Sequence, residues 1–203
     1  MAQVSVVDYG IGNTGSILNM LRKLRVDAEL VATPGALVAA QRLILPGIGA
    51  FDACIAALQR SGLGDGLLEF AARERPLLGI CVGMQMLTLG SEEGELPGLG
   101  LIRGHTRRFA EHPGLRIPHM GWDRVRWVAP DHPLAHNLAA ESRFYFVHSY
   151  RVFCESAANS LALCNYGEEF AAVIGSGKIV GVQFHPEKSH RFGLALLSNF
   201  AST

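Results

Sequence analysis

The sequence predicts a single α/β domain with a central, largely parallel sheet, helices on both faces of that sheet and an antiparallel β extension in the C-terminal half. Two observations carry this prediction. In the first half of the chain, short apolar runs alternate with segments of helical spacing, which is typical of a parallel sheet covered on both faces. From residue 101 onward, strand-like runs follow one another with few helices between them. A length of 203 residues fits one domain, which we expect to span residues 1–203.

The first half begins with a short apolar strand, Val4–Val7, followed by a helix at residues 16–25. In that helix, apolar residues recur at i, i+3, i+4 and i+7 from Ile17, the spacing of one buried helix face. The other elements expected in this half are strands at Ala28–Val31, 43–45 and 77–80, and helices at 50–60, 65–73 and 83–89.

The second half is predicted to be rich in strands. Residues 92–100 combine glutamates, glycines and a proline, which indicates a solvated loop. A helix at residues 189–201 is expected to close the chain. Between that loop and that helix, we expect strands at 101–109, 124–128, 145–152 and 171–183, the last turning back on itself at residues 176–178.

The composition is that of a compact enzyme. Apolar residues make up 49% of the chain and the net charge is +0, so nothing indicates nucleic acid or an anionic membrane as a partner. The apolar runs are short and the N-terminus lacks a signal-peptide pattern, so we expect a cytoplasmic protein. The cysteines show no C-x-x-C pair and no zinc-like spacing, and we expect neither a metal nor a cofactor. We interpret three of them as small buried hydrophobes and only Cys81 as reactive, the three being Cys54, Cys154 and Cys164.

Cys81 lies in a G-x-C-x-G motif at residues 79–83, directly after an apolar run. A strand that turns sharply into a helix with a nucleophile at the turn is the elbow of the α/β hydrolases, here with cysteine in place of serine. Flanking glycines remove the Cβ atoms that would clash in so tight a turn. The N-terminal N–H groups of the following helix would point toward the sulfur and favour the thiolate.

The second chemical motif is the strand-like run that ends in His185, Pro186 and Glu187. Residues two apart in a strand project to the same face, and a proline disfavours helical geometry at the residue before it. Glu187 is therefore expected to orient and charge-stabilise the His185 imidazole while that imidazole acts on Cys81, which is the logic of a catalytic triad.

These two motifs resemble those of the class I (triad) glutamine amidotransferases. The elbow pattern of that family, G-[IV]-C-x-G-x-Q, is matched in full by residues 79–85, and its base pattern, G-x-Q-[FY]-H-P-E, by residues 181–187. Further motifs are similar to those of the glutaminase subunit of imidazole glycerol phosphate synthase, from histidine biosynthesis; they lie at residues 46–51, 118–122, 145–150 and 185–189. The resemblance extends from Asp8 to the C-terminus and implies the fold of the family.

The resemblance implies an activity and a partner. Cys81, His185 and Glu187 would hydrolyse glutamine to glutamate and ammonia through a thioester. The ammonia would pass to a (β/α)8-barrel cyclase subunit in a heterodimer, which uses it to make imidazole glycerol phosphate. No barrel is encoded in these 203 residues, so the acceptor site is expected on another chain.

The resemblance also assigns the surroundings of the nucleophile. The backbone N–H of Val82, directly after Cys81, would donate to the oxyanion, and the loop with Ile48 and Gly49 would supply the second donor. Gln85, in the first turn after the elbow, would hold the substrate. Four residues correspond to family interface positions, namely Asn13, Met120, Trp122 and Lys188.

Two positions depart from the family pattern. Asp123 stands where asparagine is usual, which puts the local hydrogen bonding in question, and Gly15 stands where a larger residue is usual. Gly15 completes a G-x-G-x-x-G sequence at residues 10–15, the fingerprint of a dinucleotide site. The acidic candidates, Asp27 and Glu29, lie near the start of the second strand, whereas a ribose-binding acid belongs near its end. A dinucleotide-binding oxidoreductase is therefore a weak alternative.

Two further hypotheses stay open at the level of sequence. One is a stand-alone triad glutaminase that serves a different acceptor, such as pyridoxal phosphate synthesis. The second is a non-catalytic binding module, which the intact Cys81, His185 and Glu187 disfavour.

Overall fold

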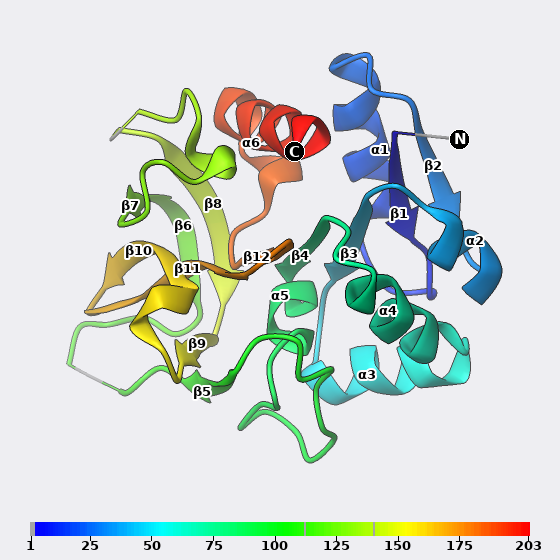
Figure 1. The fold of residues 1–203 in the computed structure, drawn as a ribbon. Coiled ribbons are helices and arrows are strands. Elements are labelled where there is room, and N and C mark those ends of the chain that lie inside the picture. The colour runs from blue at the N-terminus through cyan, green and yellow to red at the C-terminus, as the bar shows by residue number, and fades with distance from the viewer. Residues whose placement is uncertain (1–2, 112, 140) are drawn as a thin grey trace.

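The computed structural model describes residues 3–111, 113–139 and 141–203 (Figure 1). Its strands are β1 (Val4–Val7), β2 (Ala28–Val31), β3 (Leu43–Gly47), β4 (Leu77–Cys81), β5 (Gly104–Arg108), β6 (His119–Arg124), β7 (Arg126–Trp127), β8 (Arg143–His148), β9 (Tyr150–Cys154), β10 (Ser160–Tyr166), β11 (Glu168–Ser176) and β12 (Ile179–Val182). Its helices are α1 (Thr14–Lys23), α2 (Pro34–Ala39), α3 (Phe51–Arg60), α4 (Leu63–Ala72), α5 (Val82–Met86) and α6 (His190–Ser202), with 3-10 turns η1 (Pro133–Ala135), η2 (Ala157–Asn159) and η3 (Pro186–Lys188).

The main sheet has two halves of different character. Its strand order is β2-β1-β3-β4-β12-β11-β10-β7, with β9 also paired to β11 and β5 to β9. In this order, each pair of neighbours from β2 through β1, β3 and β4 to β12 is parallel. The pairs β12–β11, β11–β10 and β10–β7 are antiparallel. A separate antiparallel pair joins β6 to β8. The predicted α/β fold with a largely parallel centre and an antiparallel extension is confirmed.

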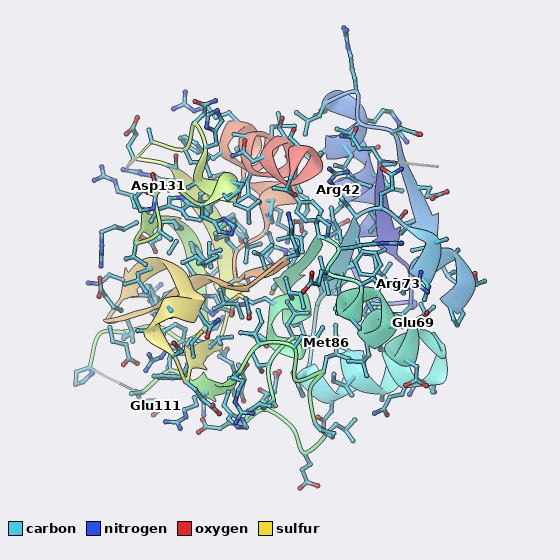
Figure 2. The ribbon with its side chains drawn as sticks, in the orientation of Figure 1. Arg42, Glu69, Arg73, Met86, Glu111 and Asp131 are labelled. Atoms are coloured by element: carbon cyan, nitrogen blue, oxygen red, sulfur yellow. The ribbon has the colours of Figure 1, made fainter. Side chains whose placement is uncertain are left out.

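Helices cover the sheet from two sides. In Figure 1, α1 and α6 lie together at the top, and α3 and α4 lie together at the bottom; each pair is in contact. Their inner faces bury the apolar residues that gave them helical spacing, such as Ile17 and Leu21 on α1. An exposed ion pair lies at the end of α4, where Arg73, the residue after the helix, donates to Glu69 at 2.6 Å; Figure 2 labels both residues.

The structure corrects several predictions. The strand expected at residues 145–152 is two strands, β8 and β9, separated at Ser149, because β8 pairs with β6 while β9 belongs to the main sheet. The strand expected at 124–128 is divided between the end of β6 and the short β7. The prediction omitted α2, although the Thr33 side chain caps it by accepting from the Ala36 N–H at 3.4 Å. It also omitted β10.

Candidate active site

Three neighbouring strands bring the chemical motifs together. β3, β4 and β12 lie side by side and parallel, with Gly47 opposite Cys81 and Val182 opposite Ile80. The carboxyl ends of these strands therefore meet at one edge of the sheet, where ligand sites of open α/β sheets are found. The oxyanion loop follows β3, the nucleophile ends β4, and the base follows β12.

Cys81 has the geometry expected of an elbow. It is buried, ends β4 directly before α5, and has φ 56 and ψ −112, a backbone conformation that non-glycine residues rarely adopt. A Cβ at Gly83 would clash with the carbonyl oxygen of Leu45, so the close approach of α5 to β3 requires glycine there. The helix is shorter than predicted and ends at Met86.

His185 and Glu187 form the predicted pair, although by a different local structure. The His185 Nδ1 atom lies 2.8 Å from the Glu187 Oε1 atom, and both side chains are buried. Glu187 is not in an extended strand, because Pro186 begins the 3-10 turn η3 and His185 precedes that turn. The His185 backbone is fixed by β8, since its N–H donates to the Tyr145 carbonyl at 2.9 Å.

The electrostatic setting of His185 favours the imidazolium. Burial lowers its pKa, but the neighbouring Cys81 and Glu187 outweigh burial and raise the pKa to about 9. Because Nδ1 faces the Glu187 carboxylate, Nε2 is the nitrogen left for the cysteine and its substrate. Nε2 is buried without a hydrogen-bond partner among the residues that the structure describes.

A cavity of about 430 Å³ opens onto Cys81 and His185. A cavity of about 620 Å³ lies elsewhere, beside Phe200 and Lys178, but its walls carry none of the predicted site residues. We therefore take the smaller cavity as the site. Its walls combine the nucleophile, the base and the oxyanion loop, and include Ile48, Gly49, Cys81, Val82, Gln85, Glu93, His148, Tyr150, His185 and Lys188.

Gln85 is held in the cavity wall by hydrogen bonds. Its Nε2 atom donates to the Gln183 Oε1 atom at 3.2 Å and to the Tyr150 carbonyl at 3.4 Å. Its Oε1 atom is buried and has no partner in the described parts of the chain. Gln183 was not predicted as a site residue, yet its Nε2 atom lies 3.9 Å from the Cys81 sulfur. Its position two residues before His185 in the strand-like run of the sequence was the available signal.

The oxyanion loop is anchored on both sides of Gly47. The Tyr9 hydroxyl donates to the Pro46 carbonyl at 2.7 Å, and the Cys54 thiol donates to the Ile48 carbonyl at 3.2 Å. Cys54 is buried as predicted, but its contact with this loop was not predicted. The other donor expected by the resemblance, Val82, is the first residue of α5 and is buried beside Cys81.

The four predicted interface residues lie outside the cavity or at its rim. Met120 and Trp122, on β6, are 61% and 41% exposed. Lys188 is exposed on η3, with its Nζ atom 5.6 Å from the centre of the Tyr145 ring, against which Trp122 also packs. Asn13 precedes α1, which contacts η3. The prediction of Trp122 as an interface residue is thus compatible with its exposure, which a core aromatic would not show.

The G-x-G-x-x-G segment has a packing explanation. A Cβ at Gly12 would lie 2.9 Å from the Pro46 side chain, so this glycine allows the β1–α1 loop to pack on the oxyanion loop. Glu29, an acidic candidate for the ribose, accepts from the Ser5 hydroxyl at 3.3 Å. Among the described residues, no group of His, Cys, Asp or Glu side chains could hold a metal ion. The same residues include no helix long and apolar enough to cross a membrane.

The chain is similar to known proteins over nearly its whole length. The family model for glutamine amidotransferase class-I matches residues 5–202. Imidazole glycerol phosphate synthase subunit HisH 2 of Methanococcus maripaludis is 47% identical over 198 residues, which cover 97% of this chain and 98% of that relative. Imidazole glycerol phosphate synthase subunit HisH of Bdellovibrio bacteriovorus is 44% identical over 202 residues, covering 98% of each.

Solved structures agree at the level of the fold. A crystal structure of a glutamine amidotransferase superposes with a TM-score of 0.76 at 19% identity, covering 98% of this chain and 99% of that one. A glutamine amidotransferase from Thermotoga maritima superposes with a TM-score of 0.64 at 20% identity, covering 93% of this chain and 77% of that one.

Proposed function

Because the chain belongs to the class I glutamine amidotransferase family, we propose that residues 1–203 form one glutaminase domain that hydrolyses glutamine to glutamate and ammonia. We further propose that it supplies this ammonia to a cyclase subunit that makes imidazole glycerol phosphate in histidine biosynthesis, as the names of its relatives suggest. The observation that carries the proposal is a buried cysteine at an elbow, in one cavity with a carboxylate-paired histidine. We expect the reaction to take place in the cytoplasm.

The first half of the reaction forms a thioester. The Cys81 thiolate attacks the side-chain amide carbon of glutamine, and the carbonyl electrons move onto oxygen. The backbone N–H groups of Val82 and of the Ile48–Gly49 loop stabilise that oxyanion, each contributing about 3 kcal/mol by the usual effect of such donors. The His185 imidazolium then gives its Nε2 proton to the nitrogen, the C–N bond breaks, and ammonia leaves.

The second half restores the enzyme. His185, now neutral, takes a proton from water, whose oxygen attacks the thioester carbon. The C–S bond breaks, glutamate leaves, and the thiolate–imidazolium pair is formed again. Glu187 keeps the proton on Nδ1 and stabilises the imidazolium. Gln85, which lines the cavity, holds the substrate.

The proposed partner is a (β/α)8-barrel cyclase in a heterodimer with this chain. The exposed Met120 and Trp122 support an interface next to the cavity rim, because aromatic residues and Met are enriched in interfaces, and Lys188 would lie at the polar edge of that interface. A stand-alone glutaminase for another acceptor, such as pyridoxal phosphate synthesis, is not favoured, since the relatives named above are synthase subunits. Neither nucleic acid nor a membrane is proposed as a partner.

The experiment that tests this function measures ammonia release from glutamine by the purified chain, with and without the candidate cyclase and its substrate. We expect rapid release only in the assembled, substrate-bound complex, together with formation of imidazole glycerol phosphate. If the chain assembled with the cyclase and substrate releases no ammonia from glutamine, the proposed function is wrong.

Replacing Glu187 with glutamine is expected to lower glutaminase turnover roughly 10³- to 10⁴-fold without abolishing it, because the oxyanion donors and substrate contacts remain. Glu187 also raises the pKa of His185, and the imidazolium is the form that protonates the departing amide nitrogen. Activity should therefore fall as the pH rises through about 9 in the wild type, and at lower pH in E187Q. The matched control is E69Q, which removes an exposed carboxylate on α4 (Figure 2). Wild-type turnover and an unshifted profile of kcat/KM against pH in E187Q would remove Glu187 from the triad.

A further inference from the structure

A second chain of hydrogen-bonded side chains lies behind the cavity and takes no part in the mechanism above. It joins three contacts in series. The Asp123 Oδ2 atom lies 2.7 Å from His119 Nε2, His119 Nδ1 lies 3.0 Å from His148 Nε2, and His148 Nδ1 lies 2.7 Å from the Tyr150 carbonyl oxygen. Both imidazoles are buried, and the Asp123 side chain is 39% exposed.

The three contacts need one hydrogen more than two neutral imidazoles can supply. Each contact at hydrogen-bond distance needs one hydrogen, so three are required. A carboxylate and a backbone carbonyl are acceptors only, and each neutral imidazole carries one N–H. Two neutral histidines therefore supply two of the three. We propose that Asp123 and His119 together hold one additional proton between Oδ2 and Nε2, and that this bound proton keeps the Tyr150 carbonyl in position at the glutamine pocket.

The surroundings place the proton at the outer contact. Burial lowers the pKa of His148 to about 3, so its ring is neutral and its single N–H serves the Tyr150 carbonyl. Burial lowers the pKa of His119 below its ordinary value and outweighs the hydrogen bond and charge of Asp123, which raise it, so the extra proton is bound on the acidic side of that ordinary value. The His119 ring is stacked between Phe146 and Tyr166, with centroids 4.7 and 4.0 Å away. The other titratable groups that face these side chains are Cys164 and Tyr166 on β10 and His185 before η3, and Arg151 on β9 lies over the Phe109 ring, which packs against both imidazoles.

The inner end of the chain reaches the site already described. The Tyr150 carbonyl accepts from His148 and also from the Gln85 Nε2 atom at 3.4 Å. His148, Tyr150 and Gln85 all line the cavity of Cys81. If the extra proton leaves, His119 keeps its single N–H toward Asp123, and the lone pairs of His119 Nδ1 and His148 Nε2 face each other at 3.0 Å. The rings must then shift, and the Tyr150 carbonyl that His148 and Gln85 share shifts with them. Asp123 and His119 are thus positioning residues, and their effect on glutamine rests on the proposed function.

Proton NMR of the full chain with 15N-labelled histidine rings tests the bound proton without reference to activity. We expect the wild type at acidic pH to show a far-downfield, slowly exchanging resonance for the hydrogen between His119 and Asp123, which disappears as the pH rises. In D123N the side-chain amide supplies the third hydrogen, so the resonance should be replaced by an ordinary amide signal that does not titrate. Absence of the far-downfield resonance from the folded wild type would overturn the proposal.

Kinetics of the assembled complex test the coupling to the pocket. The Michaelis constant for glutamine is expected to rise roughly three- to tenfold with pH in the wild type, the usual effect of losing one hydrogen bond, with little change in turnover number. D123N should lack this rise, and D123A should lack it too, because two neutral imidazoles supply both hydrogens that the two remaining contacts need. The control D131N removes an exposed carboxylate from the turn after β7 (Figure 2) and should behave as wild type. Equal pH dependence in the wild type and D123N, with the NMR signal present, would overturn the coupling while leaving the proposed glutaminase untouched.

Discussion

Replacement of Cys81 with alanine is expected to abolish glutamine-dependent synthesis by the assembled complex and to leave ammonia-dependent synthesis intact. The reason is a division of labour. Cys81 lies at the elbow, in the cavity with His185 and Gln85, and makes ammonia, whereas the proposed cyclase consumes it. Removing the nucleophile of a triad lowers turnover by about 10⁶-fold, because the residues of such a unit do not act independently.

Both activities are measured on the same preparation, once with glutamine and once with ammonium salt. Loss of both in a folded, assembled C81A complex would contradict the assigned role. The matched control is C154A, since Cys154 lies at the end of β9 and does not line the cavity. Cys54 is a less suitable control. The sequence suggests a cost in stability at most, but the Cys54 thiol contacts the Ile48 carbonyl of the oxyanion loop.

The second large effect concerns activation by the partner. We expect the isolated chain to bind glutamine but to turn it over slowly, and the partner with its substrate to raise the turnover number a hundredfold or more. Contacts to Tyr9 and Cys54 fix the carbonyls of Pro46 and Ile48, on either side of the peptide that joins Gly47 to Ile48. That peptide can turn at low steric cost, because glycines flank Ile48. One orientation presents the Ile48 N–H to the oxyanion and the other presents a carbonyl.

Docking of the cyclase would favour the orientation with the N–H inward by differential contact energy. Ile48 is 44% exposed and lines the cavity, so a partner at the rim can reach it. Steady-state kinetics with increasing glutamine separate the two effects, and the turnover number should rise much more than the Michaelis constant falls. A full glutaminase rate in the purified chain alone would contradict this switch, as would activation seen only as tighter glutamine binding.

Much of the fold followed from local patterns, and the errors have physical causes. Strands in the parallel half, such as Val4–Val7, were predicted because strands buried on both faces are continuous apolar runs. The division of residues 145–152 at Ser149 could not be predicted, since the break comes from pairing with two different sheets. Position 187 shows the same limit, because the Glu187–His185 contact forms through a 3-10 turn that the extended pattern did not indicate.

The site was predictable where chemistry is coded in adjacent residues. Cys81 and His185 lie in short motifs, and parallel pairing of β12 with β4 brings them together. Gln183 and the Asp123–His119–His148 chain were not predicted as functional, because their meaning depends on contacts between residues far apart in the sequence. Asp123 does stand out in the sequence as a departure from a family pattern. Its consequence for the hydrogen count depends on three interatomic distances, which only the folded chain defines.

The central claim is that Cys81 forms a thioester with the side chain of glutamine. Rapid acid quench of the complex during turnover, followed by intact-mass measurement and peptide mapping, tests it most directly. Because the chain has four cysteines, peptide mapping is needed to locate the adduct. We expect a γ-glutamyl adduct on the peptide that contains Cys81. The adduct should be absent in C81A and should disappear once glutamine is consumed. An adduct on any other residue, or continuous glutamine hydrolysis with no adduct at any quench time, would contradict the account.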